Sequence, residues 1–268
     1  MNRRAVMAIV RKDLRGVWRS KGVVLPLVLV PLVILGVMPA LISLVPRLAP
    51  EGSLAFMDLE RLPEGLRAEL AGLDPSRRLL VLALVYFFAP MYLIVPLMVA
   101  SVIAADSFAG EAERKTLEAL LYTPTTEGEL FLGKVLSAWL PALGVAAVGF
   151  LLYSLVADLV SWPMLGRLLL PNPMWFLLVI WVAPAVAGLG LGTMVLVSSR
   201  VRTFQEAYQL GGAVVLPILF LVVGQVTGLL YFNLVVVGLL GLFLWAVDAV
   251  LLWYGSRTFR RDALLARL

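Results

Sequence analysis

The sequence contains no cysteine and no histidine. Without thiolates and imidazoles, a cysteine nucleophile, a serine–histidine–aspartate triad and the common zinc sites are all excluded. The lack of cysteine also removes any disulfide argument about the redox compartment. An intramembrane hydrolase would need a serine–lysine pair, an aspartate dyad or a metal site within its spans, and none is visible. We expect no catalytic, cofactor-binding or metal-binding residue in this chain.

Charged residues are scarce as well. Only 15% of the residues are charged, whereas 62% are hydrophobic, and the mean hydropathy is +0.98. A soluble domain cannot bury that much apolar surface. The net charge of +5 comes mostly from arginine, and in a membrane protein it indicates topology better than nucleic-acid binding. The polar stretch before the first apolar run is too long for a cleavable signal peptide, so we expect none.

The apolar runs predict an all-α integral membrane protein with six spans in a single domain. Uncharged stretches of about 20 residues are long enough to cross a ~30 Å hydrocarbon core. The run 207–247 has no charge, and as one helix at ~1.5 Å per residue it would be roughly 60 Å long. It must therefore turn back, near Gly224, Gly228 and Asn233. The expected spans are 22–45, 79–105, 129–157, 172–198, 208–230 and 233–255.

The distribution of lysine and arginine predicts the orientation. The segments that share a side with the two termini contain sixteen of these residues, against six on the other side. The positive-inside rule then places both termini in the cytoplasm of a multi-pass protein of the cell membrane. The loop 46–78 is expected outside, with short amphipathic helices around 56–73, and the tail 256–268 inside.

Residues 1–21 predict an amphipathic helix before the first span. Apolar residues recur at helical spacing on one face, and basic residues lie on the other. Such a helix lies in the membrane interface, anchored by Trp18 and attracted to anionic lipid. A plain positively charged flank is the alternative. The apolar face consists of Val6, Met7, Val10, Leu14, Val17 and Trp18, and the basic face of Arg11, Lys12, Arg15 and Arg19.

A short stretch between the second and third spans, here called the acidic segment (residues 106–128), is charged. With Glu129 it holds six of the 17 acidic residues. We expect one amphipathic helix over 107–122, capped by Asp106 or Ser107, and a capping box, Thr126 with Glu129, that starts the next helix. A short apolar ridge within a ring of acids fits a groove on a soluble partner. A solvated loop with capped helix ends is the alternative.

The acidic segment resembles a recurring segment of the permease subunits of ABC type-2 transporters. Its pattern is acidic–small–Phe, then Gly–Glu, Thr–Leu–Glu, Leu–Leu and Pro, with aliphatic–Gly–Lys at the next helix. The matching positions are Asp106, Phe108, Gly110, Glu111, Glu113, Thr116, Leu117, Glu118, Leu120, Leu121, Pro124, Leu132, Gly133 and Lys134. The helix before the first span, with Arg11, Lys12, Asp13 and Trp18, resembles the family's elbow helix. Weaker similarity at 204–207 and 259–262 extends the resemblance over the whole chain, closest to sodium-extrusion and drug-resistance permeases.

The resemblance implies an exporter permease that forms a pathway as a dimer, with an identical or a related permease. Two copies of a separate cytoplasmic ATPase, which carry ATP and magnesium, would dock on the acidic segment as a coupling helix. ATP-driven closure would then push on the spans and alternate the access of the pathway. The residues implied in this coupling are Asp106, Gly110, Glu111, Glu113, Thr116, Leu117, Glu118, Leu120, Leu121 and Pro124.

Two other functions remain open. A non-transporting membrane subunit that anchors or regulates an ATPase would use the same segment. An ATP-independent channel or secondary transporter would need ionisable residues near the midplane and broken helices at matched positions of two halves. The spans are nearly free of charge and show no such pairing. The substrate is not indicated, since an apolar pathway is compatible with lipids, drugs, hydrophobic peptides or sodium ions.

Three local patterns have a plainer interpretation beside the functional one. Residues 128–134 fit the start of a phosphate-binding loop, but Val135 stands where Ser or Thr is needed and no strand precedes it. Asp248, within the last span, is a candidate for cation passage; alternatively it pairs with Arg257 or with water. The glycines at 188, 190 and 192 predict close helix packing, at an internal contact or at a dimer interface.

Overall fold

The structure is a computed structural model that describes residues 2–48, 64–114, 116, 125–201 and 203–258. Within these ranges the chain is helical and contains no strand. Six helices are long and apolar enough to cross a membrane, as predicted. They are Lys21–Ile42, Pro75–Glu113, Glu127–Leu165, Pro173–Ser198, Phe204–Val226 and Leu234–Arg257.

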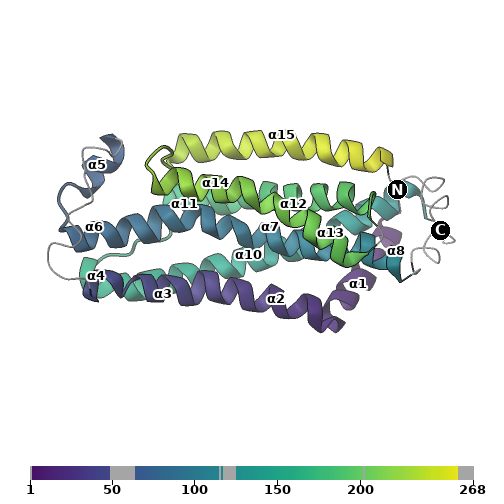
Figure 1. Cartoon of the computed structure of the whole chain (residues 1–268), viewed down its shortest axis with the longest axis horizontal. Helices are drawn as coiled ribbons and strands as arrows, with labels where there is room; N and C mark the ends of the chain where they lie inside the picture. Colours follow the sequence, from purple (N-terminus) through teal and green to yellow (C-terminus); the bar gives the residue numbers. More distant parts are fainter. Residues whose placement is uncertain (1, 49–63, 115, 117–124, 202, 259–268) are drawn as a thin grey trace.

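Several spans are divided into shorter elements (Figure 1). The first comprises α2 (Lys21–Pro31), η1 (Leu32–Val37) and α3 (Met38–Ile42), followed by α4 (Val45–Leu48). The second comprises α6 (Pro75–Val81), η3 (Leu82–Phe87), α7 (Phe88–Ala105), η4 (Asp106–Gly110) and α8 (Glu111–Glu113), and the third is α10 (Glu127–Leu165). The fourth comprises α11 (Pro173–Leu177), η5 (Leu178–Val182) and α12 (Ala183–Ser198). The fifth comprises α13 (Phe204–Gly211), η6 (Gly212–Val214) and α14 (Val215–Val226), and the sixth is α15 (Leu234–Thr258). Outside the spans lie α1 (Arg3–Arg19) and α5 (Glu64–Leu70).

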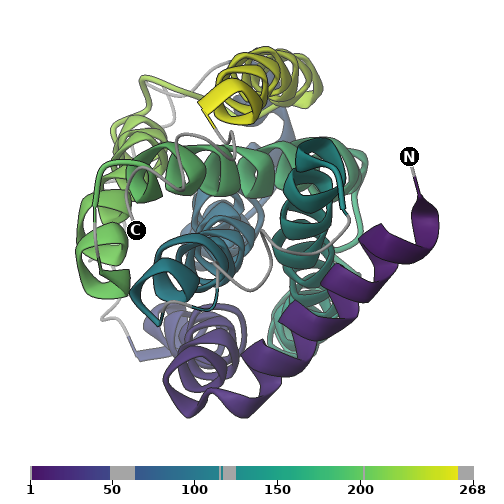
Figure 2. The same ribbon diagram turned by 90° about the vertical axis from the view of Figure 1, so that its right-hand side faces the viewer.

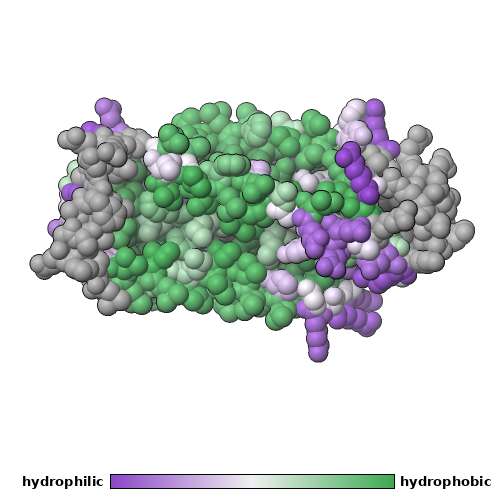
Figure 3. All heavy atoms as spheres, viewed as in Figure 1, coloured by the Kyte–Doolittle hydropathy of each residue, from purple (hydrophilic) through white to green (hydrophobic). Residues whose placement is uncertain are grey.

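The spans form an elongated bundle with α7 at its centre. In Figure 1, α1, α8 and the last turn of α15 lie at one end, here called the α1 end, and α5 lies at the other. Viewed from the α1 end, α1 runs obliquely across the bundle beside α10 (Figure 2). The second span is the most enclosed, with 78% of its most apolar window buried. On the face shown in Figure 3, a broad apolar band covers the middle of the bundle, and hydrophilic residues gather at the α1 end. This is the surface that a lipid bilayer requires.

Four π-helical turns interrupt the spans, and three of them precede a proline. Their residues are 32–37, 82–87, 106–110 and 178–182. Pro39, Pro90 and Pro184 follow the first, second and fourth turns within three residues. Proline lacks an N–H and clashes with the carbonyl one turn earlier, so a wider turn accommodates it without ending the helix. The turn 106–110 has no such proline and needs another cause.

Side chains of neighbouring helices donate hydrogen bonds to the carbonyls of these turns. The Tyr153 hydroxyl donates to Leu84 O and the Trp175 indole Nε1 to Val85 O, both in η3. The Trp245 indole Nε1 donates to Trp181 O in η5 at 3.2 Å. In a membrane, a carbonyl released from helical pairing needs such a partner. The π-turns are therefore where spans far apart in sequence are joined.

Three glycines of α12 allow close packing, but only inside the chain. A Cβ at Gly188 would lie 2.4 Å from Asp248 Oδ2, and one at Gly192 would lie 2.9 Å from Leu251 Cβ, both on α15. At Gly190 it would lie 2.6 Å from Ser101 Oγ on α7. The predicted close packing is confirmed. The alternative of a dimer interface at these glycines is wrong, because all three face helices of the same chain.

The loop outside the spans agrees with the prediction in its described part. The helix α5 buries Leu66 and Leu70 and lies within the expected amphipathic stretch, whose residues 56–63 are outside the described ranges. The Tyr86 hydroxyl donates to Glu69 Oε2 at 2.6 Å, which joins α5 to the second span. The predicted turn in the run 207–247 is also present. There α14 ends at Val226, Gly228 has a φ of +75°, and the Asn233 side chain accepts from Val236 N.

Packing of α12 against α15 predicts a compensating pair of substitutions. Gly188→Ala should destabilise the protein by about 1–3 kcal/mol, because the new methyl group overlaps the Asp248 carboxyl group. In an Asp248→Ala background the same methyl group fits, so the double variant should regain most of the loss. Thermal unfolding of the four proteins in detergent measures this coupling. Equal losses from Gly188→Ala in both backgrounds would contradict the packing.

Candidate functional site

The second span does not end where the acidic segment begins. Asp106 and Ser107 have helical neighbours on both sides, and the helix continues through η4 and α8 to Glu113. The prediction that Asp106 or Ser107 caps a new helix is therefore wrong: Asp106 has helical φ and ψ, and a cap residue does not. The span carries Glu111 and Glu113 directly at the α1 end.

Glu111 forms a buried ion pair with Lys134 of α10. The Lys134 Nζ lies 2.6 Å from Glu111 Oε2, and the two side chains are 0% and 8% exposed. Charges this enclosed are tolerated only when they are paired and hydrogen-bonded. Glu111 was predicted to contact a partner protein, yet its carboxylate points into the chain. Glu111 therefore binds residues of its own chain through both carboxylate oxygens.

Lys134 also accounts for the π-turn without a proline. Its Nζ donates to Ser107 O at 2.5 Å, within η4, and lies 5.3 Å from the centre of the Phe108 ring. The ammonium group thus satisfies a carbonyl that the wider turn releases, as the tyrosine and tryptophan donors do elsewhere. One buried lysine joins the second span to the third through both a side chain and the backbone.

The helix α1 extends this set of contacts through Lys12 and Asp13. Lys12 donates to Glu111 Oε1, and its Nζ lies 3.3 Å from Asp13 Oδ1. Asp13 Oδ2 in turn accepts from the Ser137 hydroxyl of α10 at 3.0 Å. Charges therefore alternate along Lys134, Glu111, Lys12 and Asp13. We call these four residues and Ser137 the charge network.

Lys12 stays protonated over the neutral range. Burial alone would lower its pKa, but the hydrogen bond and charge of Glu111, with the charge of Asp13, raise the pKa above its ordinary value. A raised pKa means that the stabilisation is complete below the ordinary lysine pKa of about 10.4 and is lost only as pH rises past the folded value. The contact between α1 and Glu111 is thus insensitive to pH near neutrality.

The face of α1 that packs on the bundle differs from the predicted apolar face. Val6, Val10 and Val17 are buried as expected, but so are Ile9 and Asp13. A Cβ at Gly133 would lie 2.9 Å from Ile9, so the two helices are in close contact. Met7 and Trp18, by contrast, are 50% and 74% exposed. The helix is docked on α10, and the side with Trp18 is the one left for lipid.

The capping box at the start of α10 is joined to the start of α1 through Glu129. The predicted capping box is confirmed: Thr126 Oγ1 accepts from Glu129 N, and Glu129 Oε2 accepts from Thr126 N at 3.0 Å. The other oxygen, Glu129 Oε1, accepts from Asn2 N at 2.5 Å, while the Asn2 side chain caps α1. Glu129 therefore holds the first residues of α1 and α10 together.

The remaining described acids also bind within the chain. Asp106 Oδ1 lies 3.0 Å from Arg114 Nη1, and this pair closes over Gly110, where a Cβ would lie 2.9 Å from Asp106 Oδ1. Glu113 Oε2 accepts from Phe204 N, the first residue of α13, at 2.8 Å. The Thr116 hydroxyl donates to Glu111 O at 3.3 Å. Leu117, Glu118, Leu120, Leu121 and Pro124 lie outside the described residues.

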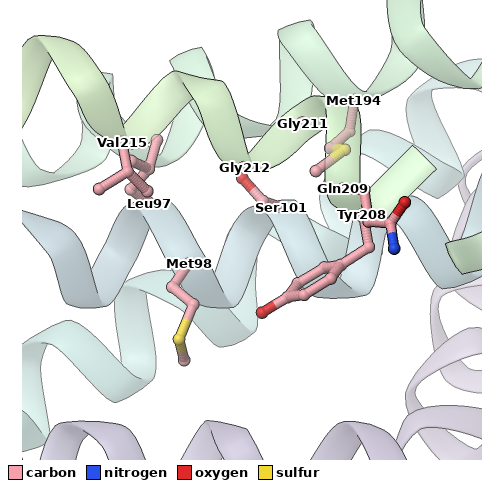
Figure 4. Close-up of a pocket in the computed structure, with 9 residues that line it drawn as sticks. All are labelled: Leu97, Met98, Ser101, Met194, Tyr208, Gln209, Gly211, Gly212 and Val215. Carbon is pink, nitrogen blue, oxygen red and sulfur yellow. The ribbon is translucent and has the colours of Figure 1, made fainter. Parts of the chain in front are cut away.

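A cavity of about 300 Å³ lies beside α13 (Figure 4). Its walls are mostly apolar, and its polar groups are the Ser101 and Tyr208 hydroxyls and the Gln209 amide. The Tyr208 and Met98 side chains extend into the same space in Figure 4. The lining comes from α7, α12, α13, η6 and α14: Leu97, Met98, Ser101, Met194, Tyr208, Gln209, Gly211, Gly212 and Val215.

Asp248 is not paired with Arg257. Its side chain is buried against Gly188, and neither carboxyl oxygen has a hydrogen-bond partner among the described residues. The Arg257 guanidinium instead lies over the Trp253 ring, 3.8 Å from its centre. The predicted pairing with Arg257 is wrong, because the cation stacks on the aromatic ring.

Sequence reasoning missed the inward direction of the acids and the partners Asn2, Ser137 and Phe204. One signal was present, because Lys134 is a charge at the start of an apolar run and so needs a carboxylate nearby. Residues 128–134, which fit the start of a phosphate-binding loop, lie on the helix α10. Within the described ranges, no group of three or more acidic residues is placed to hold a metal ion.

Six apolar spans, of which the second and third are joined at one end by a buried ion pair, define a multi-pass helical membrane protein. A family model described as ABC-2 family transporter protein matches residues 7–239, and the chain belongs to this family. It is a permease component of an ABC-type transporter. No curated protein matched the chain, and its placement in the sodium-extrusion or drug-resistance branch stays a prediction.

The buried ion pair predicts a large effect of removing one partner. Lys134→Met should destabilise the protein by about 3–5 kcal/mol, because Glu111 keeps only its contact with Lys12. Glu111→Gln in the same chain should restore part of the loss. The matched control is Asp106→Asn, which breaks an ion pair whose arginine is 54% exposed and should cost about 0–1 kcal/mol. Thermal unfolding in detergent compares the variants, and equal shifts for the two pairs would contradict the buried arrangement.

Proposed function

We propose that this chain is the permease subunit of an ATP-driven exporter, that two permeases form the pathway, and that each docks on a separate cytoplasmic ATPase. The family match carries the proposal, since it covers 7–239 and includes the acidic segment and the spans on both sides. The ATP and magnesium belong to the partner, and the chain itself contributes no catalytic residue.

The arrangement at the α1 end supports a coupling role for the acidic segment. Glu111 and Glu113 precede residues 117–124, and Glu129 follows them. These flanking acids bind α10, α1 and α13. A force applied to the segment would therefore reach the second, third and fifth spans and the elbow helix together. A flexible loop that hangs free of the bundle could not transmit a force in this way.

The basic residues support a cytoplasmic position of the α1 end. Six lysines and arginines precede the first span, and Lys21 is its first residue; the six are Arg3, Arg4, Arg11, Lys12, Arg15 and Arg19. The positive-inside rule assigns such a cluster to the cytoplasmic side. Both the elbow helix and the acidic segment would then face a cytoplasmic ATPase.

Purification of the tagged chain from its native membranes in mild detergent tests the proposal. We expect an ATPase subunit in about equal amount, since two permeases with two ATPase copies give a ratio of one to one. Glu118→Lys should abolish its retention, because a reversed charge opposes a docking surface that recognises acids. Glu64→Lys, an equivalent reversal on the exposed side of α5, should leave retention unchanged.

The outcomes separate the competing functions. A chain that purifies alone as an intact oligomer would contradict the proposal and favour a channel or secondary transporter. An ATPase that stays bound, but whose activity moves no solute in reconstituted vesicles, would favour the anchoring or regulatory subunit.

A further inference from the structure

Glu113 occupies a different position from the other acids of the acidic segment. Glu111 is enclosed by two lysines, and Asp106 binds an arginine on its own helix. Glu113 instead receives a backbone N–H from another span, that of Phe204 at the start of α13. The carboxylate sits where the helix leaves unpaired N–H groups and a positive dipole end, which favours a negative charge. Thr203 caps the same end by accepting from Glu206 N.

The helix α13 connects this contact to the cavity. Its residues Tyr208, Gln209 and Gly211 line the cavity, one to two turns after Phe204. Ala207 and Gly211 are buried, and a Cβ at Gly211 would overlap Met194 of α12. At Gly212 the helix passes into the single turn η6 before α14. Since α13 is short and ends at an irregular turn, a displacement of its first residue shifts the cavity wall with little change in α14.

The contact between Glu113 and Phe204 N is weak enough to open and form again. Glu113 is exposed, so water can replace either partner when the contact opens, and the net stabilisation is that of a single charged hydrogen bond. The pair of Glu111 with Lys134 is buried, and its separation would leave charges without water. Of the two, only Glu113 can detach and return during each cycle.

We propose that Glu113 is a positioning residue for transport, which passes movement of the end of the second span to α13 and so sets the width of the cavity between α7, α13 and α14. This inference rests on the proposed function for the source of the movement. The contact between Glu113 and Phe204 does not depend on the proposed function. The role differs from a direct contact between Glu113 and an ATPase, which the resemblance implied.

The first experiment uses the permease alone and the absence of native cysteine. Gln209→Cys places a single thiol on the cavity wall, and the rate of its reaction with a water-soluble maleimide reports the access to the cavity. Glu113→Ala should change this rate by about tenfold, the factor that corresponds to the lower end of the range for one charged hydrogen bond. In Glu113→Gln the amide oxygen still accepts the Phe204 N–H. Its labelling rate should therefore lie between that of Glu113→Ala and that of the protein with Glu113 intact. Glu64→Ala, the same change on α5, should leave the rate unaltered. An unchanged rate in Glu113→Ala would overturn the proposal.

The second experiment uses the complex with its ATPase. Trapping with ATP and vanadate should change the labelling rate in the Gln209→Cys protein, and Glu113→Ala should remove this response while ATP hydrolysis persists. A full response in Glu113→Ala would overturn the proposal. So would loss of ATPase retention in Glu113→Ala with a normal labelling rate, which would assign Glu113 to the partner contact. If no ATPase binds although the first experiment succeeds, the proposed function fails, and the transport role of Glu113 fails with it.

Discussion

The enclosure of Lys134 constrains the rest of the α1 end. An ammonium group with no exposed surface needs acceptors on every side, and the chain supplies Glu111 and the carbonyl of Ser107. These contacts fix the register of α10 against the second span and require the wider turn at 106–110. Because Glu111 has a second oxygen to satisfy, α1 is held in place through Lys12 as well. A single buried charge thus determines the position of three helices.

The acidic segment is attached to the bundle by its own acids. Its described acids are bound within the chain, so the ring of negative charge expected at a docking surface is largely used for internal contacts. Residues 114–128 lie between two acids, Glu113 and Glu129, that bind other helices of the bundle. In the proposed mechanism a force on the segment therefore has two routes: a rigid one through Glu111 to α10 and α1, and a weaker one through Glu113 to α13.

Features that depend on local spacing could be predicted from the sequence. The six spans follow from the length of the apolar runs, the capping box from Thr126 and Glu129, and the turn in the last run from its glycines and Asn233. Features that depend on the register between distant helices could not. Asp13 lies among basic residues in the sequence, and only the approach of Ile9 to Gly133 brings it to Ser137. The cap predicted at Asp106 is wrong because Lys134 stabilises a continuous helix there. The predicted pair of Asp248 with Arg257 is wrong because Arg257 stacks on the ring of Trp253.

The π-turn at 106–110 carries one residue more than the α-helix around it. Conversion of this turn to a regular α-helix would rotate the helix that follows by about 100° and move it by ~1.5 Å relative to the helix before it. Glu111 follows the turn directly, so such a rotation would carry its carboxylate away from Lys134. The buried ion pair therefore holds the end of the second span in one rotational position about its own axis.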